Sequence, residues 1–355
     1  MRPQIFFPAL VCCTVLMLFG MTLMTSQQSM AKDESVNLYS YRQTFLIKPI
    51  LDQFTAKTGI KVNVVYAKKG MLERLKAEGE AGPADAVLTV DIGRLHDMVK
   101  ANVLQPIQSK QLHTNIPANL RHPDGLWYGL TTRARILFVS NERVKKGEIN
   151  SYEDLADPKF KGRICIRSGK HVYNISLFAS MIAHKGKAGA KTWLTGLKAN
   201  LARKPQGNDR AQAKAIYQGQ CDVAVANTYY FAKMATNKKK PVQKKWANAL
   251  RIVFPNQGDR GTHVNISGAA VVKGAKNKAN AIKLIEFLSS DFAQKVYADQ
   301  NYEYPVKSGV PLNPLVKSWG TFKADTINLD ALAKNRAAAS RLVDEVKFNK
   351  AGGNS

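Results

Sequence analysis

The alternation of short apolar segments with amphipathic ones most restricts how this chain can fold. Apolar stretches at residues 36–40, 62–66 and 86–90 each fit a strand. Each is followed by a segment whose apolar residues have helical spacing, the second at residues 71–78 and the third at 94–102. This strand–helix order predicts a parallel sheet with helices on both faces.

The alternation resumes beyond two long apolar segments, residues 129–139 and 264–272, which are candidates for strands that cross between two domains. Further strands are expected at residues 164–166, 223–227 and 252–254, and helices at 174–183, 191–201, 209–217, 279–298 and 329–346. The prediction is an α/β protein of two lobes joined by two strand crossovers. A cleft between lobes is the natural ligand site and can close by hinge motion.

The predicted boundaries follow from those crossings. The N-terminal lobe comprises residues 32–131 and 264–308, and the C-terminal lobe comprises residues 132–263 and 309–355. Residues 1–31 are expected to lie outside the fold as a secretory signal peptide, because Arg2 precedes an apolar run and Ala31 ends a small-x-small cleavage site. An uncleaved membrane anchor is the alternative.

The chain is strongly basic, with 53 Lys and Arg against 26 Asp and Glu, and a net charge of +27. The lysines are spread widely, and the densest groups flank Pro241 in a predicted surface loop. A dispersed positive surface favours solubility and attraction of anions over a specific nucleic-acid groove. No nucleic-acid partner is therefore expected.

Two cysteines remain beyond the signal peptide, Cys165 and Cys221, and an exported protein can join them in a disulfide. Each lies eight residues before a tyrosine, Tyr173 or Tyr229. If both cysteines begin neighbouring strands, a bridge would join the two strand starts. Free buried thiols are the alternative.

Tyr229 and Tyr230 lie where the predicted strand at residues 223–227 gives way to a helix, with Thr228 as a predicted N-cap. Ligands of open α/β sheets bind at the carboxyl ends of strands. Two converging phenol oxygens suit a hard, highly charged cation. Ordinary aromatic packing is the alternative reading.

Four segments together resemble the periplasmic ferric-iron-binding proteins of bacterial ABC iron transporters. They are residues 36–43 (VNLYSYRQ), 167–174 (RSGKHVYN), 204–210 (KPQGNDR) and 227–230 (NTYY). The resemblance runs through essentially the whole chain after residue 31. It implies a type II periplasmic-binding-protein fold, a periplasmic location, an inner-membrane ABC permease as partner, monomeric behaviour, and ferric iron received free or as a chelate.

In that family three tyrosine phenolates hold Fe³⁺, and the matching residues here are Tyr173, Tyr229 and Tyr230. Three phenolates leave an octahedral ion with open positions, which relatives often fill with a small anion such as carbonate. Arg42 matches the arginine that holds this anion from the facing lobe, and Gln43 is a candidate helper.

One position departs from part of the family. Some relatives follow that arginine with a His-Tyr pair that ligates iron, whereas this chain has Gln43 and Thr44. A site of three tyrosines and an anion is therefore expected. Tyr41 and Arg133 are candidate supporting residues, with packing and ordinary strand burial as their alternatives.

Other cargoes remain open alternatives at this point, because lobes of this kind also carry anions, thiamine and polyamines. A polyamine or thiamine site would need acidic residues in the cleft, whereas the candidates are phenols, Arg42 and Gln43. An enzyme is not expected: the six histidines have no metal-site spacing, and there is no phosphate-binding glycine loop, HExxH motif or nucleophile elbow.

Overall fold

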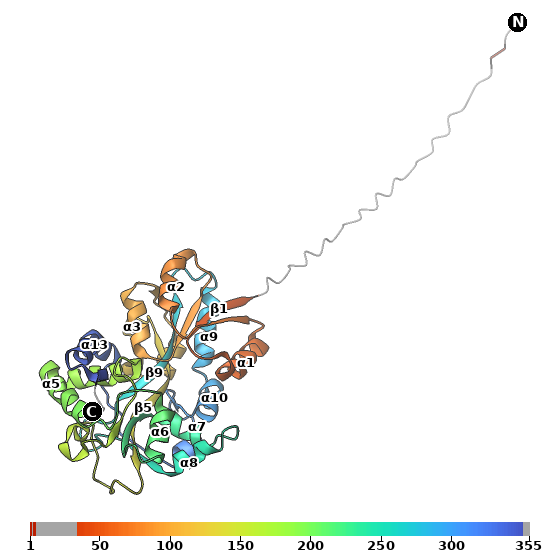
Figure 1. Ribbon diagram of the computed structural model, residues 1–355. Helices are drawn as coiled ribbons and strands as arrows, with labels where there is room; N and C mark the ends of the chain where they lie inside the picture. The colour runs from red at the N-terminus through yellow and green to blue at the C-terminus, as the bar shows by residue number, and fades with distance from the viewer. Residues whose placement is uncertain (2, 5–33, 351–355) are drawn as a thin grey trace. The chain divides into compact units, whose positions relative to one another are not determined.

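The computed structural model describes residues 1, 3–4 and 34–350 (Figure 1). The predicted signal peptide at residues 1–31 lies almost entirely outside the described residues. None of the helices in the described part of the chain is both long and apolar enough to cross a membrane.

The N-terminal third forms the predicted parallel sheet. Strands β1 (Ser35–Ser40), β2 (Lys61–Tyr66) and β3 (Ala86–Thr89) alternate with helices α1 (Lys48–Thr58), α2 (Met71–Glu78) and α3 (Ile92–Lys100). Strand β1 pairs in parallel with β2 and with β3. Gly59 ends α1 with a φ of 73°, a backbone conformation that glycine adopts without steric cost.

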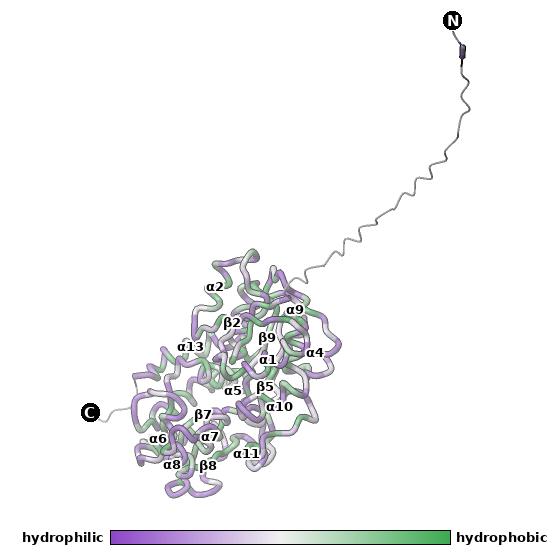
Figure 2. The backbone as a smooth tube through the Cα atoms, turned by 90° about the vertical axis from the view of Figure 1, so that its right-hand side faces the viewer, coloured by the Kyte–Doolittle hydropathy of each residue, from purple (hydrophilic) through white to green (hydrophobic). Residues whose placement is uncertain are grey.

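Strand β5 (Tyr128–Ser140) connects two sheets. Its first part, up to Ala134, pairs with β9 (Val264–Val272), which in turn pairs with β3. Its second part, from Arg135, pairs with β7 (Val223–Asn227) and β8 (Leu250–Val253). With β6 (Ile164–Cys165) at one edge, the strand order is β2-β1-β3-β9-β5-β7-β6. Hydrophobic segments gather around β5 and β9 (Figure 2).

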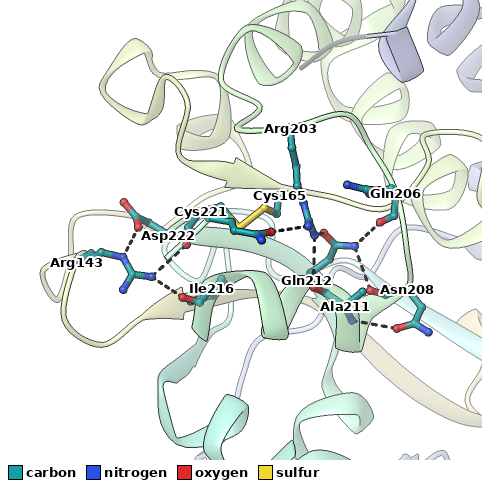
Figure 3. The surroundings of a disulfide bond; sticks show 11 residues. Arg143, Cys165, Arg203, Gln206, Asn208, Ala211, Gln212, Ile216, Cys221 and Asp222 are labelled. Carbon is teal, nitrogen blue, oxygen red and sulfur yellow. Dashed lines mark hydrogen bonds and ion pairs between the residues drawn. A yellow bond between two sulfur atoms is a disulfide. The ribbon is translucent and has the colours of Figure 1, made fainter. Parts of the chain in front are cut away.

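The second sheet has helices α5 (Val172–Ala199), α6 (Asp209–Tyr217), α7 (Thr228–Ala235) and α8 (Val242–Asn248) around it. Strand β6 (Ile164–Cys165) runs parallel to β7, so the predicted neighbouring strands are confirmed. Cys165 and Cys221 form a disulfide with their Cα atoms 5.9 Å apart (Figure 3). Of the two alternatives for the cysteines, the structure has the bridge.

Four predicted helices have different bounds. The segments 174–183 and 191–201 belong to one element, α5, which is kinked at Gly186. The predicted helix at 279–298 is two helices, α9 (Lys278–Leu288) and α10 (Asp291–Asn301), because Ser290 is extended and its side chain caps the second. The predicted helix at 329–346 divides into α12 (Leu329–Lys334) and α13 (Arg336–Glu345).

The remaining short elements are β4 (Leu104–Gln105), α4 (Lys110–Asn115), β10 (Tyr304–Pro305) and α11 (Pro314–Lys317). The C-terminal helices contact both halves of the molecule. Arg336 on α13 pairs with Asp91 at 3.0 Å, and Asp330 on α12 contacts His96 of α3 at 3.1 Å. Helices α12 and α13 also pack on α5. This segment, predicted to belong to the C-terminal lobe, also contacts α3.

Candidate functional site

A cavity of about 260 Å³ lies between the two sheets and brings together all the predicted site residues. Tyr173, Tyr229, Tyr230 and Arg210 line one wall. The facing wall includes Tyr41, Arg42, Gln43, Arg133 and Glu303. The seven residues selected from the sequence thus line one cavity, although they come from four separate parts of the chain.

The three tyrosines are positioned by the starts of two helices. All five residues of β7 are buried, and α7 begins directly after it, so Tyr229 and Tyr230 fall in the first helical turn. Tyr173 is the second residue of α5. Asn227 occupies the N-cap position that the sequence assigned to Thr228; its side-chain oxygen accepts a hydrogen bond from Arg135 instead of capping the helix.

The phenol groups converge. The hydroxyl of Tyr229 donates to the hydroxyl oxygen of Tyr173 at 3.1 Å, and the rings of Tyr229 and Tyr230 lie 4.4 Å apart between centroids. Burial raises the pKa of Tyr230 to about 12, with a further contribution from the nearby Tyr173 phenol. Burial and the same neighbours raise the pKa of Tyr229 well above its ordinary value. Both are therefore neutral phenols at neutral pH in the metal-free protein.

A buried ionic network lies behind the tyrosines. Asp209, which is fully buried at the start of α6, accepts hydrogen bonds from Arg135 at 2.7 Å and Arg167 at 2.8 Å. The carboxylate also accepts from the backbone amide of Asn227 at 2.9 Å, two residues before Tyr229. Burial alone would raise the pKa of Asp209, but the two guanidinium groups lower it, so the group is ionised.

This network also reaches the third tyrosine. Arg135 donates to the side chain of Asn174, the residue after Tyr173, at 2.7 Å. The guanidinium carbons of Arg135 and Arg167 lie 5.8 Å and 5.2 Å from the centroid of the Tyr173 ring. One carboxylate thus fixes the starts of α5, α6 and α7 relative to one another, and with them the three phenols.

On the facing wall Arg42 is 4% exposed, and its guanidinium is already paired. Its Nη2 donates to Glu303 at 2.8 Å and to the Ser267 hydroxyl at 2.5 Å. Burial disfavours the charged form of both groups, but each charge stabilises the other. The pKa of Arg42 is therefore raised by Glu303, and the pKa of Glu303 is lowered by Arg42. The pair is therefore fully charged, and the Nε of Arg42 is buried without a hydrogen-bond partner among the described residues.

The other selected residues differ in exposure. Gln43 is exposed at the cavity rim, before the 3₁₀ turn Thr44–Leu46. Tyr41 is half-buried, with the guanidinium carbon of Arg94 3.9 Å from its ring centroid. Arg133 is buried and donates to Ser267 at 3.3 Å and to the Val90 carbonyl.

His171 is not among the residues that line the cavity. It caps α5, with its Nδ1 accepting from the backbone amide of Tyr173 at 3.2 Å. Burial, together with the charges of Arg167 and Arg135, lowers its pKa to about 3. His171 is therefore a neutral acceptor that holds the helix start at Tyr173.

Comparison with known proteins identifies the family. The family model for bacterial extracellular solute-binding proteins matches residues 83–335. The chain belongs to this family. Iron uptake protein A1 of a Synechocystis strain is 47% identical over 315 residues, which is 88% of this chain and 87% of the relative. The Major ferric iron-binding protein of Neisseria meningitidis is 30% identical over 85% of this chain and 86% of its own.

Solved structures of similar proteins support the same family assignment. The apo Ferric ion-Binding Protein A of Pasteurella haemolytica is 54% identical, with a TM-score of 0.84 over 89% of this chain and 99% of that one. A Trichodesmium protein solved in complex with iron and citrate ligands is 46% identical, with a TM-score of 0.85 over 88% and 99%. This solute-binding protein has the two-lobed type II fold that the sequence predicted.

Sequence reasoning missed three charged residues of this solute-binding protein: Asp209, Arg135 and Glu303. Asp209 lies inside the segment 204–210 that carried the family resemblance, so a signal for it was present. Arg135 occurs two residues after Arg133 on β5, and alternate residues of a strand face the same side. Glu303 is separated from Arg42 by 261 residues, and no local pattern in the sequence connects the two.

Proposed function

We propose that this chain is a periplasmic substrate-binding protein that binds one ferric ion through Tyr173, Tyr229 and Tyr230 and delivers it to an ABC permease. The convergence of three phenols on one wall of an interlobe cavity is the observation that carries this proposal. The printed names of the similar proteins, which include ferric iron-binding and iron uptake proteins, support the same cargo.

The ligand set suits the cargo. Fe³⁺ is small and hard, and three phenolate oxygens neutralise its charge. Because the phenols of Tyr229 and Tyr230 are neutral before binding, the metal displaces their protons. A bound anion adds negative charge to this balanced set, and the buried guanidinium groups of Arg135 and Arg167 beside Tyr173 partly compensate it.

Arg42 and Gln43 hold a synergistic anion in this proposal. Glu303 accepts from Nη2 of Arg42, so the anion would use the remaining N–H groups of the guanidinium together with the exposed amide of Gln43. Carbonate is one candidate, and the relative solved with iron and citrate makes citrate another. Tyr41 and Arg133 support this wall, Tyr41 through its stacking with Arg94 and Arg133 through Ser267.

The remaining roles follow from the same proposal. Residues 1–31 direct export and are removed. One lobe comprises residues 32–131 and 264–308, and the other comprises residues 132–263 and 309–355. The protein acts as a monomer without catalytic activity. Strand β5 supports the first boundary, because it changes pairing partners between Ala134 and Arg135. Delivery requires contact with an inner-membrane permease.

Polyamine cargo is not favoured, although distant relatives at 23–25% identity are spermidine/putrescine-binding proteins. Among the described residues that line the cavity, Glu303 is the one carboxylate, and Arg42 neutralises it. A cationic amine would therefore meet an uncompensated positive wall.

The test is a titration of metal-free protein with ferric iron in bicarbonate buffer, followed by visible absorption. A tyrosinate-to-iron charge-transfer band that saturates at one iron per chain is expected. Tyr229→Phe should weaken the band and the affinity, while Tyr217→Phe, which alters an exposed tyrosine away from the cavity, should change neither. If Tyr229→Phe binds iron as well as the unaltered protein does, the assignment of this site is wrong.

A further inference from the structure

The cavity lined by Tyr173, Tyr229 and Tyr230 is called the iron cavity from here on, after its proposed cargo. A second hollow lies beside it, on the surface formed by α6, α8 and the loop after α7. Its volume of about 470 Å³ is within the range of roughly 300–1,000 Å³ found for small-molecule sites. We call it the basic groove. Its lining residues are Asn208, Arg210, Ala211, Lys214, Asn237, Lys240, Gln243 and Trp246.

The groove is surrounded by unbalanced positive charge. Residues 203–249 contain ten Lys and Arg and two carboxylates, Asp209 and Asp222. Asp209 is paired with Arg135 and Arg167, and Asp222 with Arg143 and Arg163 (Figure 3 shows the Arg143 pair). None of the three cations that line the groove forms an ion pair with any residue that the structure describes. Such a surface attracts anions.

The loop that carries Lys240 is held in place. The side chain of Asn237 donates to Gln243 on α8 at 2.9 Å and accepts from the backbone amide of Lys240 at 2.9 Å. Trp246, which is half-buried on α8, forms part of the same lining. The groove therefore has a defined wall and is more than a set of scattered surface lysines.

Arg210 lines both the basic groove and the iron cavity. Its guanidinium carbon lies 5.0 Å from the ring centroid of Tyr230, and its Nε is buried without a partner among residues 34–350. Arg210 is thus shared by the two hollows, and an anion in the groove would bind its guanidinium group close to Tyr230. Because the two hollows share this residue, they adjoin, and one ligand can present a metal to the tyrosines and free carboxylates to the groove.

We propose that the basic groove binds the carboxylate groups of a polycarboxylate chelator in which ferric iron reaches this protein. This inference rests on the proposed function. A hydrated ferric cation is repelled by the charges around the cavity, whereas an anionic ferric chelate is attracted to them. The groove holds the chelator by charge-assisted hydrogen bonds from Arg210, Lys214 and Lys240 while the phenols take the metal.

The test compares two double variants of the signal-peptide-free protein. Lys214→Glu/Lys240→Glu alters the groove but no residue of the iron cavity, and Lys244→Glu/Lys245→Glu makes the same charge change outside the groove lining. Titration calorimetry of the metal-free proteins with citrate, and then with inorganic phosphate, measures anion binding. Visible absorption measures the rate of iron loading from ferric citrate and from an uncharged ferric tris-hydroxamate.

We expect the groove variant to bind citrate about tenfold more weakly and to load more slowly from ferric citrate. Its final absorption band from the uncharged donor should be unchanged, and the control variant should resemble the unaltered protein in both assays. Equal losses of citrate affinity in the two variants, or unchanged citrate binding in the groove variant, would overturn the inference. Phosphate binding as tightly as citrate would also overturn it.

The same experiment separates this inference from the proposed function. If the unaltered protein gives no absorption band with either iron donor, the proposed iron site fails. The citrate titrations of metal-free protein still decide whether the groove binds a polycarboxylate.

Discussion

The two walls of the iron cavity differ in how their polar groups are satisfied. The phenols of Tyr173 and Tyr229 bond to each other, and no cation forms an ion pair with them among the described residues. On the facing wall Arg42 and Glu303 already neutralise each other. The phenol wall has oxygen ligands with no charged partner, so a metal that displaces their protons breaks no ion pair there, whereas a new ligand on the facing wall competes with the pair of Arg42 and Glu303.

This difference implies a division of labour. In the proposed function, the wall of Tyr173, Tyr229 and Tyr230 binds the metal with ligands positioned by the Asp209 network, and the facing wall contributes the anion. Variants that alter one wall at a time can therefore separate the two roles.

The largest effect is expected from loss of one phenol oxygen. Tyr229→Phe should lower iron affinity about a thousandfold or more, because an anionic ligand of a trivalent ion is replaced by a hydrogen atom. Competition with a chelator of known affinity measures this change. Gln43→Ala, on the other wall, serves as the comparison, and similar losses in the two variants would contradict the division of labour.

Removal of the Asp209 carboxylate behind the phenols should also lower the stability of the protein strongly. Asp209→Ala leaves Arg135 and Arg167 buried without their counter-ion, and we expect a loss of about 3–5 kcal/mol in the free energy of unfolding. Denaturant unfolding monitors it. Asp259→Ala, at an exposed ion pair, should cost about 0–1 kcal/mol. An equal cost for the two variants would show that the network does not stabilise this wall.

Iron binding should weaken steeply with acidity. The pKa of Tyr230 is raised to about 12 and that of Tyr229 is raised as well, so binding near neutral pH releases a proton from each. Affinity should therefore fall about a hundredfold or more for each unit of decreasing pH. Competition assays between pH 6 and 8 measure the slope. A slope near zero would mean that these phenols stay protonated in the complex.

The smallest effect is expected at the rim of the charged wall. Gln43→Ala should reduce affinity by only about three- to tenfold, because it removes one solvent-exposed hydrogen bond from a neutral amide to the anion. The loss should appear in bicarbonate buffer and disappear when bicarbonate is omitted. A loss that persists without the anion would place Gln43 in contact with the metal instead.

Local patterns predicted much of this molecule. Helices α2 and α6 and strands β7 and β9 have the bounds that spacing predicted, because each has a regular apolar pattern and a clear start or end. The break in the segment 279–298 was missed because Ser290 is compatible with a helix until its capping bond is seen.

The strand-to-helix junction indicated Tyr229 and Tyr230 as candidate ligands, because such junctions place side chains at a sheet edge, and the family resemblance added Tyr173. The pairing of Arg42 with Glu303 could not be predicted, because the two residues are 261 positions apart in the sequence. The same holds for Arg210, whose position between two hollows depends on how α6 packs on α8.

The number of tyrosines that ionise when one iron binds tests the central claim most directly. Ultraviolet difference spectra, recorded at constant pH while iron is added, count newly formed phenolates. The account predicts three phenolates per iron in the unaltered protein and two in Tyr229→Phe. Iron binding at full stoichiometry without any new phenolate would contradict it.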